Sequence, residues 1–264
     1  MVRYQLRLLL LALQFFTRIP VVGAVAQWVG YTPEMLRASA RFFPLIGLMI
    51  GAAAALVFWL CAQLWSPWIA AILTLIFSAL LTGAFHEDGL ADYADGIGGG
   101  TTTARALEIM KDSRIGSYGA LALCLATALK LAALGTMATA LAPVALILAH
   151  LIGRVCACCV LARLSYVRDD ASSKSKPLSD SMRAAEFAFV LFTLLSTLTL
   201  VWLWQPNLLE YLGAALILSG ICTLVIARQM LRCIGGFTGD ALGAVEQLGE
   251  CAVLLAFASH LIWR

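Results

Sequence analysis

The residues best placed to do chemistry lie in one short stretch, His86–Gly96, which contains Glu87, Asp88, Asp92 and Asp95. On a helix each residue turns about 100°, so Asp92 lies roughly 40° to one side of Asp88 and Asp95 roughly 20° to the other. The three aspartates therefore share a face, whereas Glu87 points about 100° away from it. Like charges at this spacing repel each other, and a bound cation relieves the repulsion. Oxygen ligands without His or Cys favour Mg²⁺, or Mn²⁺, over zinc.

A second acidic segment, rich in glycine, lies near the end of the sequence. It contains Asp240, and Glu246 and Glu250 follow four residues apart, the spacing of neighbours on one helix face. Gly239 and Gly243 form a small-x-x-x-small face, which lets another helix approach closely. We expect this contact to bring Asp240 to the first acidic stretch.

Basic residues form two groups between these segments. Arg105, Lys111 and Arg114 belong to a predicted polar helix and the loop after it, where they can hold an anionic substrate. Lys130 and Arg154 instead lie in the middle of apolar segments. A charge at the bilayer centre costs a few kcal/mol even on the lenient insertion scale, so such residues usually face a polar cavity. We expect phosphate oxygens or the aspartates to be their partners there, and we assign both a catalytic role.

The elements that position these residues must be membrane helices. The chain is 62% hydrophobic and only 12% charged, with a mean hydropathy of +0.91, whereas soluble proteins average about 25% charged residues. The composition predicts an all-α, polytopic integral membrane bundle, which we take as a single catalytic domain over residues 1–264. The eight cysteines lie almost wholly in apolar runs, which favours buried thiols over disulfides or zinc ligands.

Apolar runs predict about six to seven transmembrane helices. The candidate spans are Phe42–Leu64, Pro67–Phe85, Tyr118–Leu141, Pro143–Leu164, Phe187–Trp204, Leu208–Ala227 and a shorter one at about Ala241–Trp263. The N-terminal segment, Met1–Thr17, is too short to span comfortably, so we expect a retained, half-inserted or interfacial helix. Lys and Arg gather in connections 86–117, 163–186 and 228–240, which places these connections in the cytoplasm. We therefore predict an inner-membrane protein whose active site faces the cytoplasm.

Taken together, these motifs closely resemble those of the cobalamin synthases, the adenosylcobinamide-GDP ribazoletransferase family. The resemblance covers essentially the full length and is carried by Phe16–Pro20, Phe43–Gly47, His86–Gly96, Glu108–Gly116, Lys130 and Gly236–Ala244. Two features depart from the family pattern: Glu87 stands where an apolar residue is usual, and loop 165–186 has no match.

The resemblance implies transfer of the adenosylcobinamide phosphoryl group from its GDP-activated form to a ribose hydroxyl of α-ribazole or its 5′-phosphate. GMP leaves, and Mg²⁺ is required. The site residues predicted on this basis are Asp88, Asp92 and Asp95 for the metal, His86, Arg105, Lys111, Arg114, Thr238 and Gly239 for substrate binding, and Asp240, Lys130 and Arg154 for catalysis. The expected partners are these two substrates and membrane lipid, without nucleic acid, and the sequence leaves homo-oligomer formation open.

Other interpretations have to be weighed against this one. The acidic stretch could be a solvated loop, the glycines mere helix packing, and the basic helix an ordinary charged surface. A spacing similar to that of His86–Gly96 also occurs in CDP-alcohol phosphotransferases, which makes headgroup transfer the alternative enzyme activity. An ion-coupled transporter is the alternative outside enzymes, but transporters usually place acids or broken helices at mid-membrane in both halves, and no such pairing is visible here.

Overall fold

The computed structural model describes residues 2–167 and 182–259, and within these ranges it is helical and contains no strand. This confirms the predicted all-α class. The elements are α1 (Val2–Phe16), α2 (Gly23–Val29), α3 (Pro33–Ser39), η1 (Ala40–Phe42), α4 (Phe43–Ala62), α5 (Pro67–Thr82), α6 (Phe85–Gly99), α7 (Thr103–Ile109), α8 (Ser117–Thr136), α9 (Ala142–Leu161), α10 (Ala184–Trp204), η3 (Pro206–Leu208), α11 (Leu209–Cys233) and α12 (Gly239–Phe257).

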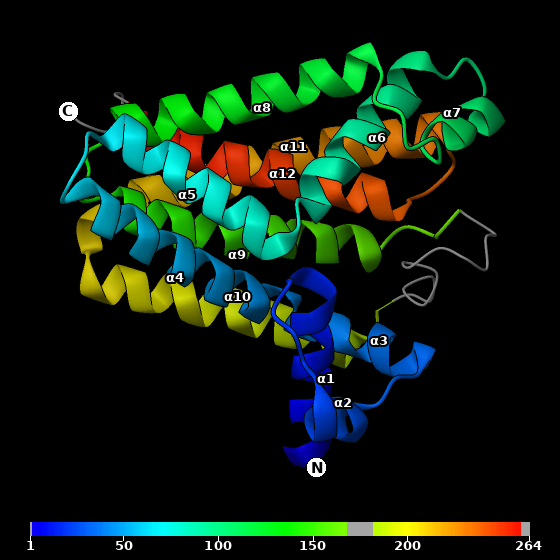
Figure 1. The fold of residues 1–264 in the computed structure, drawn as a ribbon, viewed down its shortest axis with the longest axis horizontal. Coiled ribbons are helices and arrows are strands. Elements are labelled where there is room, and N and C mark those ends of the chain that lie inside the picture. Colours follow the sequence, from blue (N-terminus) through cyan, green and yellow to red (C-terminus); the bar gives the residue numbers. More distant parts are fainter. Residues whose placement is uncertain (1, 168–181, 260–264) are drawn as a thin grey trace.

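The long helices run side by side as a bundle, with α9 and α12 at its centre (Figure 1). Helix α9 is apolar on nearly every side and is almost wholly buried, as a core helix should be. Small residues let its neighbours come close. A Cβ added to Gly51 of α4 would lie 2.7 Å from the Cα of Ile147, and one on Gly249 of α12 would lie 3.1 Å from the Cα of Gly153.

Among residues 2–167 and 182–259, five helical segments are long and apolar enough to cross a membrane, or six when the bent pair α5–α6 counts as one span. The predicted span Pro67–Phe85 ends earlier than expected, at Thr82, because the chain bends by 89° between the two helices. The predicted seventh span exists as α12, but it is not among these segments. Its polar residues face the bundle interior, as their burial shows.

The bend between α5 and α6 rests on two residues in the left-handed region. Gly83 has φ +69° and Ala84 has φ +54°, and Ala84 is also the N-cap of α6. Glycine adopts this conformation without steric cost, whereas alanine pays a modest penalty. The bend therefore ends α5 as a helix and sends α6 across the bundle (Figure 1).

The N-terminal helices α1, α2 and α3 form a group at one end of the bundle (Figure 1). Arg37 and Arg41 tie this group to α10, because both bind the buried Glu186, at 3.2 and 2.8 Å. The predicted half-insertion of α1 into the membrane stays a prediction.

Connections 86–117 and 228–240 meet at one end, where Thr103 donates a hydrogen bond to the carbonyl of Cys233 at 2.9 Å. Most of connection 163–186 lies outside the described residues.

Candidate active site

The acidic stretch forms helix α6, as the sequence predicts, but its three aspartates meet different surroundings. Asp88 is exposed, Asp92 is half-buried and Asp95 is buried. Both Asp95 oxygens accept backbone hydrogen bonds, from Gly116 at 2.7 Å and from Gly119 at 2.8 Å. These N–H groups belong to the start of α8, so Asp95 satisfies a helix N-terminus from a distant part of the chain.

The metal role predicted for the aspartates is supported by the type of their ligand atoms and not by a gathered set of ligands. Within residues 2–167 and 182–259, no group of three or more His, Cys, Asp or Glu side chains is gathered closely enough to hold a metal ion. Asp88 and Asp92 lie one turn apart on α6 and offer only carboxylate oxygens, the ligands that Mg²⁺ prefers. Their chemistry fits such an ion, and the metal site stays a prediction.

Helices α6 and α12 touch through glycines, which brings Asp240 to the acidic helix. A Cβ on Gly89 would lie 3.0 Å from the Asp240 carbonyl oxygen, and one on Gly243 would lie 3.2 Å from the Gly89 Cα. This is the close approach predicted from the glycine spacing. Thr238 is fully buried and its hydroxyl accepts from Ala241 N at 3.2 Å, so this predicted substrate-binding residue serves as the N-cap of α12.

His86 and Arg154 do not face the acidic surface but meet inside the bundle. Glu246 of α12 joins them: its carboxylate lies 2.8 Å from His86 Nε2 and 2.8 Å from Arg154 Nη1. The Phe16 ring covers both, stacked on the imidazole at 5.3 Å between centroids and 5.3 Å from the guanidinium carbon. The prediction that the aspartates would be the partners of Arg154 is therefore wrong, since a glutamate of α12 forms its ion pair. The predicted contact of Arg154 with phosphate stays a prediction.

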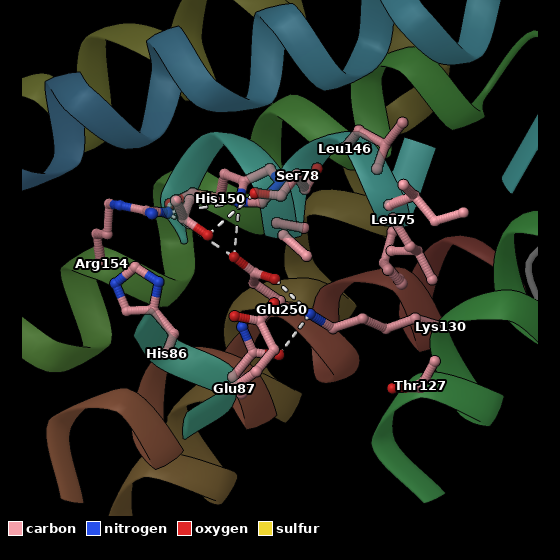
Figure 2. A pocket seen from close by; sticks show the side chains of 16 residues that line it. Leu75, Ser78, His86, Glu87, Thr127, Lys130, Leu146, His150, Arg154 and Glu250 are labelled. Atoms are coloured by element: carbon pink, nitrogen blue, oxygen red, sulfur yellow. Dashed lines mark hydrogen bonds and ion pairs between the residues drawn. The ribbon is translucent and has the colours of Figure 1, made fainter. Parts of the chain in front are cut away.

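One helical turn further along α12, Glu250 is the partner of a second set of residues (Figure 2). Its carboxylate lies 2.5 Å from Lys130 Nζ and 2.6 Å from His150 Nδ1, and Gln247 accepts from Lys130 at 2.8 Å. Arg154 Nη1 is 3.8 Å away. The aspartates are not the partners of Lys130 either, and its predicted contact with phosphate stays a prediction. Because charges in a low-dielectric interior must be paired, each glutamate is required by the cation that it faces.

These ion pairs border a cavity of about 230 Å³ at the centre of the bundle (Figure 2). Its wall includes the polar and charged side chains of His86, Glu87, Lys130 and Glu250, and α5 contributes apolar side chains together with Ser78 and Thr82. Most of the accessible lining is apolar, so the intramembrane cations face a cavity that is polar only where these side chains reach it.

The basic group after α6 lies on the surface, as predicted, and its charges are partly neutralised locally. Arg105 pairs with Glu108 at 2.7 Å, and Arg114 pairs with Asp112 at 2.6 Å. Hydrogen bonds from Arg114 lower the pKa of the Asp112 carboxyl to about 2. An anionic substrate would have to compete with these carboxylates for the two arginines. Lys111 lies between them and is also exposed.

Residues 8–258 match the family model described as Cobalamin-5-phosphate synthase. The chain belongs to this family. It is similar to adenosylcobinamide-GDP ribazoletransferases from Vibrio cholerae serotype O1 (46% identity, covering 98% of this chain and 97% of that protein), Shewanella amazonensis (45%, 98% and 96%) and Albidiferax ferrireducens (44%, 96% and 97%). No solved structure matches it. The chain is thus a transferase of cobalamin biosynthesis built as a multi-pass membrane protein, which confirms the resemblance seen in the sequence.

Sequence reasoning missed the residues that organise the interior of this family member. Glu246, Glu250 and His150 were not among the predicted site residues, although the structure places them between the two intramembrane cations. A signal was present in the sequence. Two glutamates four residues apart on a helix otherwise apolar enough to be buried need cationic partners, and Lys130 and Arg154 were the intramembrane cations available.

Proposed function

We propose that this protein transfers the adenosylcobinamide phosphoryl group from adenosylcobinamide-GDP to α-ribazole or its 5′-phosphate. The observation that carries the proposal is the contact of α6 with α12, which sets the acidic helix beside Asp240 in a chain whose relatives carry that name. A phosphoryl transfer between two bulky polar molecules depends on positioning and on neutralising charge. An acidic, metal-binding face beside basic side chains is suited to both.

Asp88 and Asp92 would hold Mg²⁺, or Mn²⁺, since they lie one turn apart and offer only oxygen ligands. The ion would neutralise the diphosphate of the donor. Asp95 is committed to α8 by two hydrogen bonds, so its part is to fix the orientation of α6. Asp240, which lies beside α6, would take the proton of the attacking hydroxyl or share the metal. Lys111, Arg105 and Arg114 lie on the connection that follows α6 and would attract the anionic donor.

The reaction proposed is a single in-line displacement. The ribose oxygen forms a bond to the corrinoid-linked phosphorus as the bond from that phosphorus to the GMP oxygen breaks, and the hydroxyl proton passes to a base. A covalent enzyme intermediate has little support, because carboxylates bound to a metal are poor nucleophiles. The buried Cys156 lies in the interior of α9, away from the acidic helix, and burial keeps a thiol protonated. We place this chemistry on the cytoplasmic side of the inner membrane, where the connections rich in Lys and Arg belong.

The test is Mg²⁺-dependent GMP release from adenosylcobinamide-GDP by the purified protein, with α-ribazole and its 5′-phosphate as acceptors. Asp88→Asn and Asp92→Asn keep size and hydrogen bonding but remove charge, so turnover should fall on the order of 100-fold or more while the protein still inserts. Glu210→Gln makes the same acid-to-amide change at an exposed residue in the first turn of α11, so it is the control and should leave turnover unchanged. Near-normal turnover in both aspartate variants would remove the metal site from the proposal.

Stereochemistry tests the displacement itself. A donor made chiral at the transferred phosphorus should give a product of inverted configuration, because one in-line attack inverts the centre. Retention, or a phosphoryl-enzyme adduct trapped without acceptor, would require two displacements.

A further inference from the structure

A second cavity, of about 420 Å³, lies where the end of α1 meets the bend between α5 and α6. Its walls combine aromatic and polar side chains, contributed by Gln14, Phe15, Arg18, Tyr31 and Phe85 among others. It is separate from the 230 Å³ cavity of Figure 2, because the two cavities share only one lining residue, Thr82. The volume falls within the range of about 300 to 1,000 Å³ that small-molecule sites occupy in proteins.

The backbone of Arg18 is held at the end of α5, and its exposed side chain lines this cavity. Its N–H donates to the Leu81 carbonyl at 2.7 Å. Its side chain lies directly against Gly83, so closely that a Cβ on Gly83 would overlap the guanidinium. Position 83 therefore favours glycine for two reasons: its backbone is left-handed, and the Arg18 side chain occupies the space that a Cβ would need.

The charge of Arg18 has no neutralising partner in the part of the chain that the structure describes. No carboxylate of residues 2–167 or 182–259 forms an ion pair with it, whereas Arg37 and Arg41 at the same end of the bundle both bind Glu186. The Arg18 side chain is exposed, and its guanidinium is therefore available to bind phosphate through two parallel hydrogen bonds.

The aromatic walls add a second recognition element. Phe15 and Phe85 meet edge to face with centroids 5.4 Å apart, and Tyr31 contributes both a ring and a hydroxyl group. Rings of this kind stack on flat heteroaromatic bases. A phosphate-binding cation beside aromatic walls matches a ligand that joins such a base to a phosphate through a sugar.

The cavity also adjoins the acidic helix. Phe85, one of its walls, is the first residue of α6, and Asp88 follows three residues later, about 4.5 Å along the helix axis. Asp92, the other proposed metal ligand, is about 10.5 Å from Phe85 along the same axis. A ligand that packs against Phe85 would therefore lie at the start of the helix that carries both proposed metal ligands.

We propose that this cavity binds the base and phosphate of a nucleotide-type group, with Arg18 contacting the phosphate. The inference rests on the proposed function, because its donor carries such a group and so does its acceptor when phosphorylated. The donor contains guanosine diphosphate, and the phosphorylated acceptor contains a benzimidazole riboside 5′-phosphate. One cavity with one arginine accommodates one of these groups, and the experiment has an arm for each.

The first measurement is steady-state kinetics of the purified full-length protein, with each substrate varied in turn. Arg18→Met should raise KM for one substrate about tenfold or more and change kcat much less, because a charge-assisted bond to phosphate is lost. Arg18→Lys keeps the charge and should recover part of the loss. Arg3→Met makes the same change at an exposed position on α1 and should leave both KM values unchanged.

The two KM values show which substrate contributes the group that binds in the cavity. A higher KM for adenosylcobinamide-GDP assigns the cavity to the guanosine arm. A higher KM for α-ribazole 5′-phosphate, with that for unphosphorylated α-ribazole unchanged, assigns it to the acceptor. If both KM values stay within twofold of the unmodified protein, the inference is overturned.

A glycine pair tests the geometry. Gly83→Ala should reproduce the KM effect of Arg18→Met, because the added methyl group displaces the guanidinium. Gly23 has a similar left-handed φ, +62°, and a Cβ there would meet nothing within 4 Å, so Gly23→Ala carries the backbone strain without the displacement. Equal effects of the two variants on KM would mean that strain alone is responsible, and would count against the inference.

Direct binding separates this inference from the proposed function. Equilibrium dialysis measures the binding of GMP and of α-ribazole 5′-phosphate, each alone, to the unmodified protein. Because no second substrate is present, the measurement does not depend on turnover. Binding of one probe that Arg18→Met weakens about tenfold supports the cavity even in a protein without transferase activity. Binding of neither probe, or binding that ignores Arg18, overturns it even where the transferase reaction is observed.

Discussion

The buried pair of Lys130 and Glu250 gives the sharpest test of how the bundle interior is held together. Lys130 Nζ lies 2.5 Å from the glutamate, and its other hydrogen bond goes to the neutral Gln247. Glu250 keeps His150 at 2.6 Å and Arg154 at 3.8 Å when the lysine is removed. The two single changes therefore leave unequal defects, because the lysine loses its charged partner whereas the glutamate retains others.

Breaking a buried ion pair by removing one partner costs about 3 to 5 kcal/mol. We expect Lys130→Met near the lower end of that range and Glu250→Gln near the upper end. The double variant Lys130→Met, Glu250→Gln removes both charges, so it should cost less than Glu250→Gln alone. The two single losses sum to about 8 kcal/mol, so the coupling energy in the double-mutant cycle should be about 3 kcal/mol or more. Glu108→Gln, from an exposed pair, is the control and should cost at most about 1 kcal/mol.

The assay is unfolding of the purified protein in mixed micelles with increasing denaturing detergent, followed by tryptophan fluorescence. Strictly additive losses in the double variant would refute the reasoning, because they would mean that the two side chains do not interact. Turnover measured on the same samples separates structure from catalysis. If the double variant regains stability without regaining activity, Lys130 has the catalytic role predicted for it; if both return together, the pair is structural.

Three further predictions follow from the same structure. Asp95→Ala should destabilise the protein by about 1 to 3 kcal/mol in the same unfolding assay, because two backbone N–H groups at the start of α8 lose their acceptor; an unchanged midpoint would contradict the capping role. Because Arg114 lowers the pKa of Asp112 to about 2, the pair contributes stability above the ordinary carboxyl pKa and loses it only as pH falls towards 2. Asp112→Asn should accordingly leave the shape of the activity profile between pH 5 and 8 unchanged, and a shifted profile would show that this carboxyl titrates there. A reporter fused at Lys174, outside the described residues, should read out as cytoplasmic, and a periplasmic signal would place the predicted site residues on opposite faces of the membrane.

Local features of the sequence were enough to predict the helices and the main helix contact at the site. The apolar runs predict the long helices because membrane spans must satisfy their own backbone hydrogen bonds. The aspartate spacing placed three carboxylates on one helix, and Gly239 with Gly243 predicted the close contact that the structure shows between α6 and α12. Each of these inferences uses residues within a few turns of one another, where helix geometry alone decides the outcome.

Pairings between distant segments were beyond the reach of such reasoning. Asp95 was predicted as a metal ligand because nothing near it in the sequence shows that Gly116 and Gly119 would donate to it. Lys130 and Arg154 were correctly expected to need partners, but which carboxylates would reach them depends on how α8, α9 and α12 pack. The bend after α5 was missed for a different reason: Gly83 is a plausible turn residue, whereas Ala84 gives no sign of its left-handed conformation.

The bend explains how one helix serves two environments. His86, in the first turn of α6, is only 3% exposed and pairs with Glu246 inside the bundle, whereas Asp88, two residues later, is exposed. A straight continuation of α5 would carry both residues along the same axis through the bilayer. Turning α6 by 89° lets its start remain anchored to the buried ion pairs while its aspartates lie along the end of the bundle. The ion pairs of Glu246 with His86 and Arg154 therefore fix the start of the acidic helix inside the bundle. A substitution that removes one of these pairs should displace the aspartates even though no aspartate is changed.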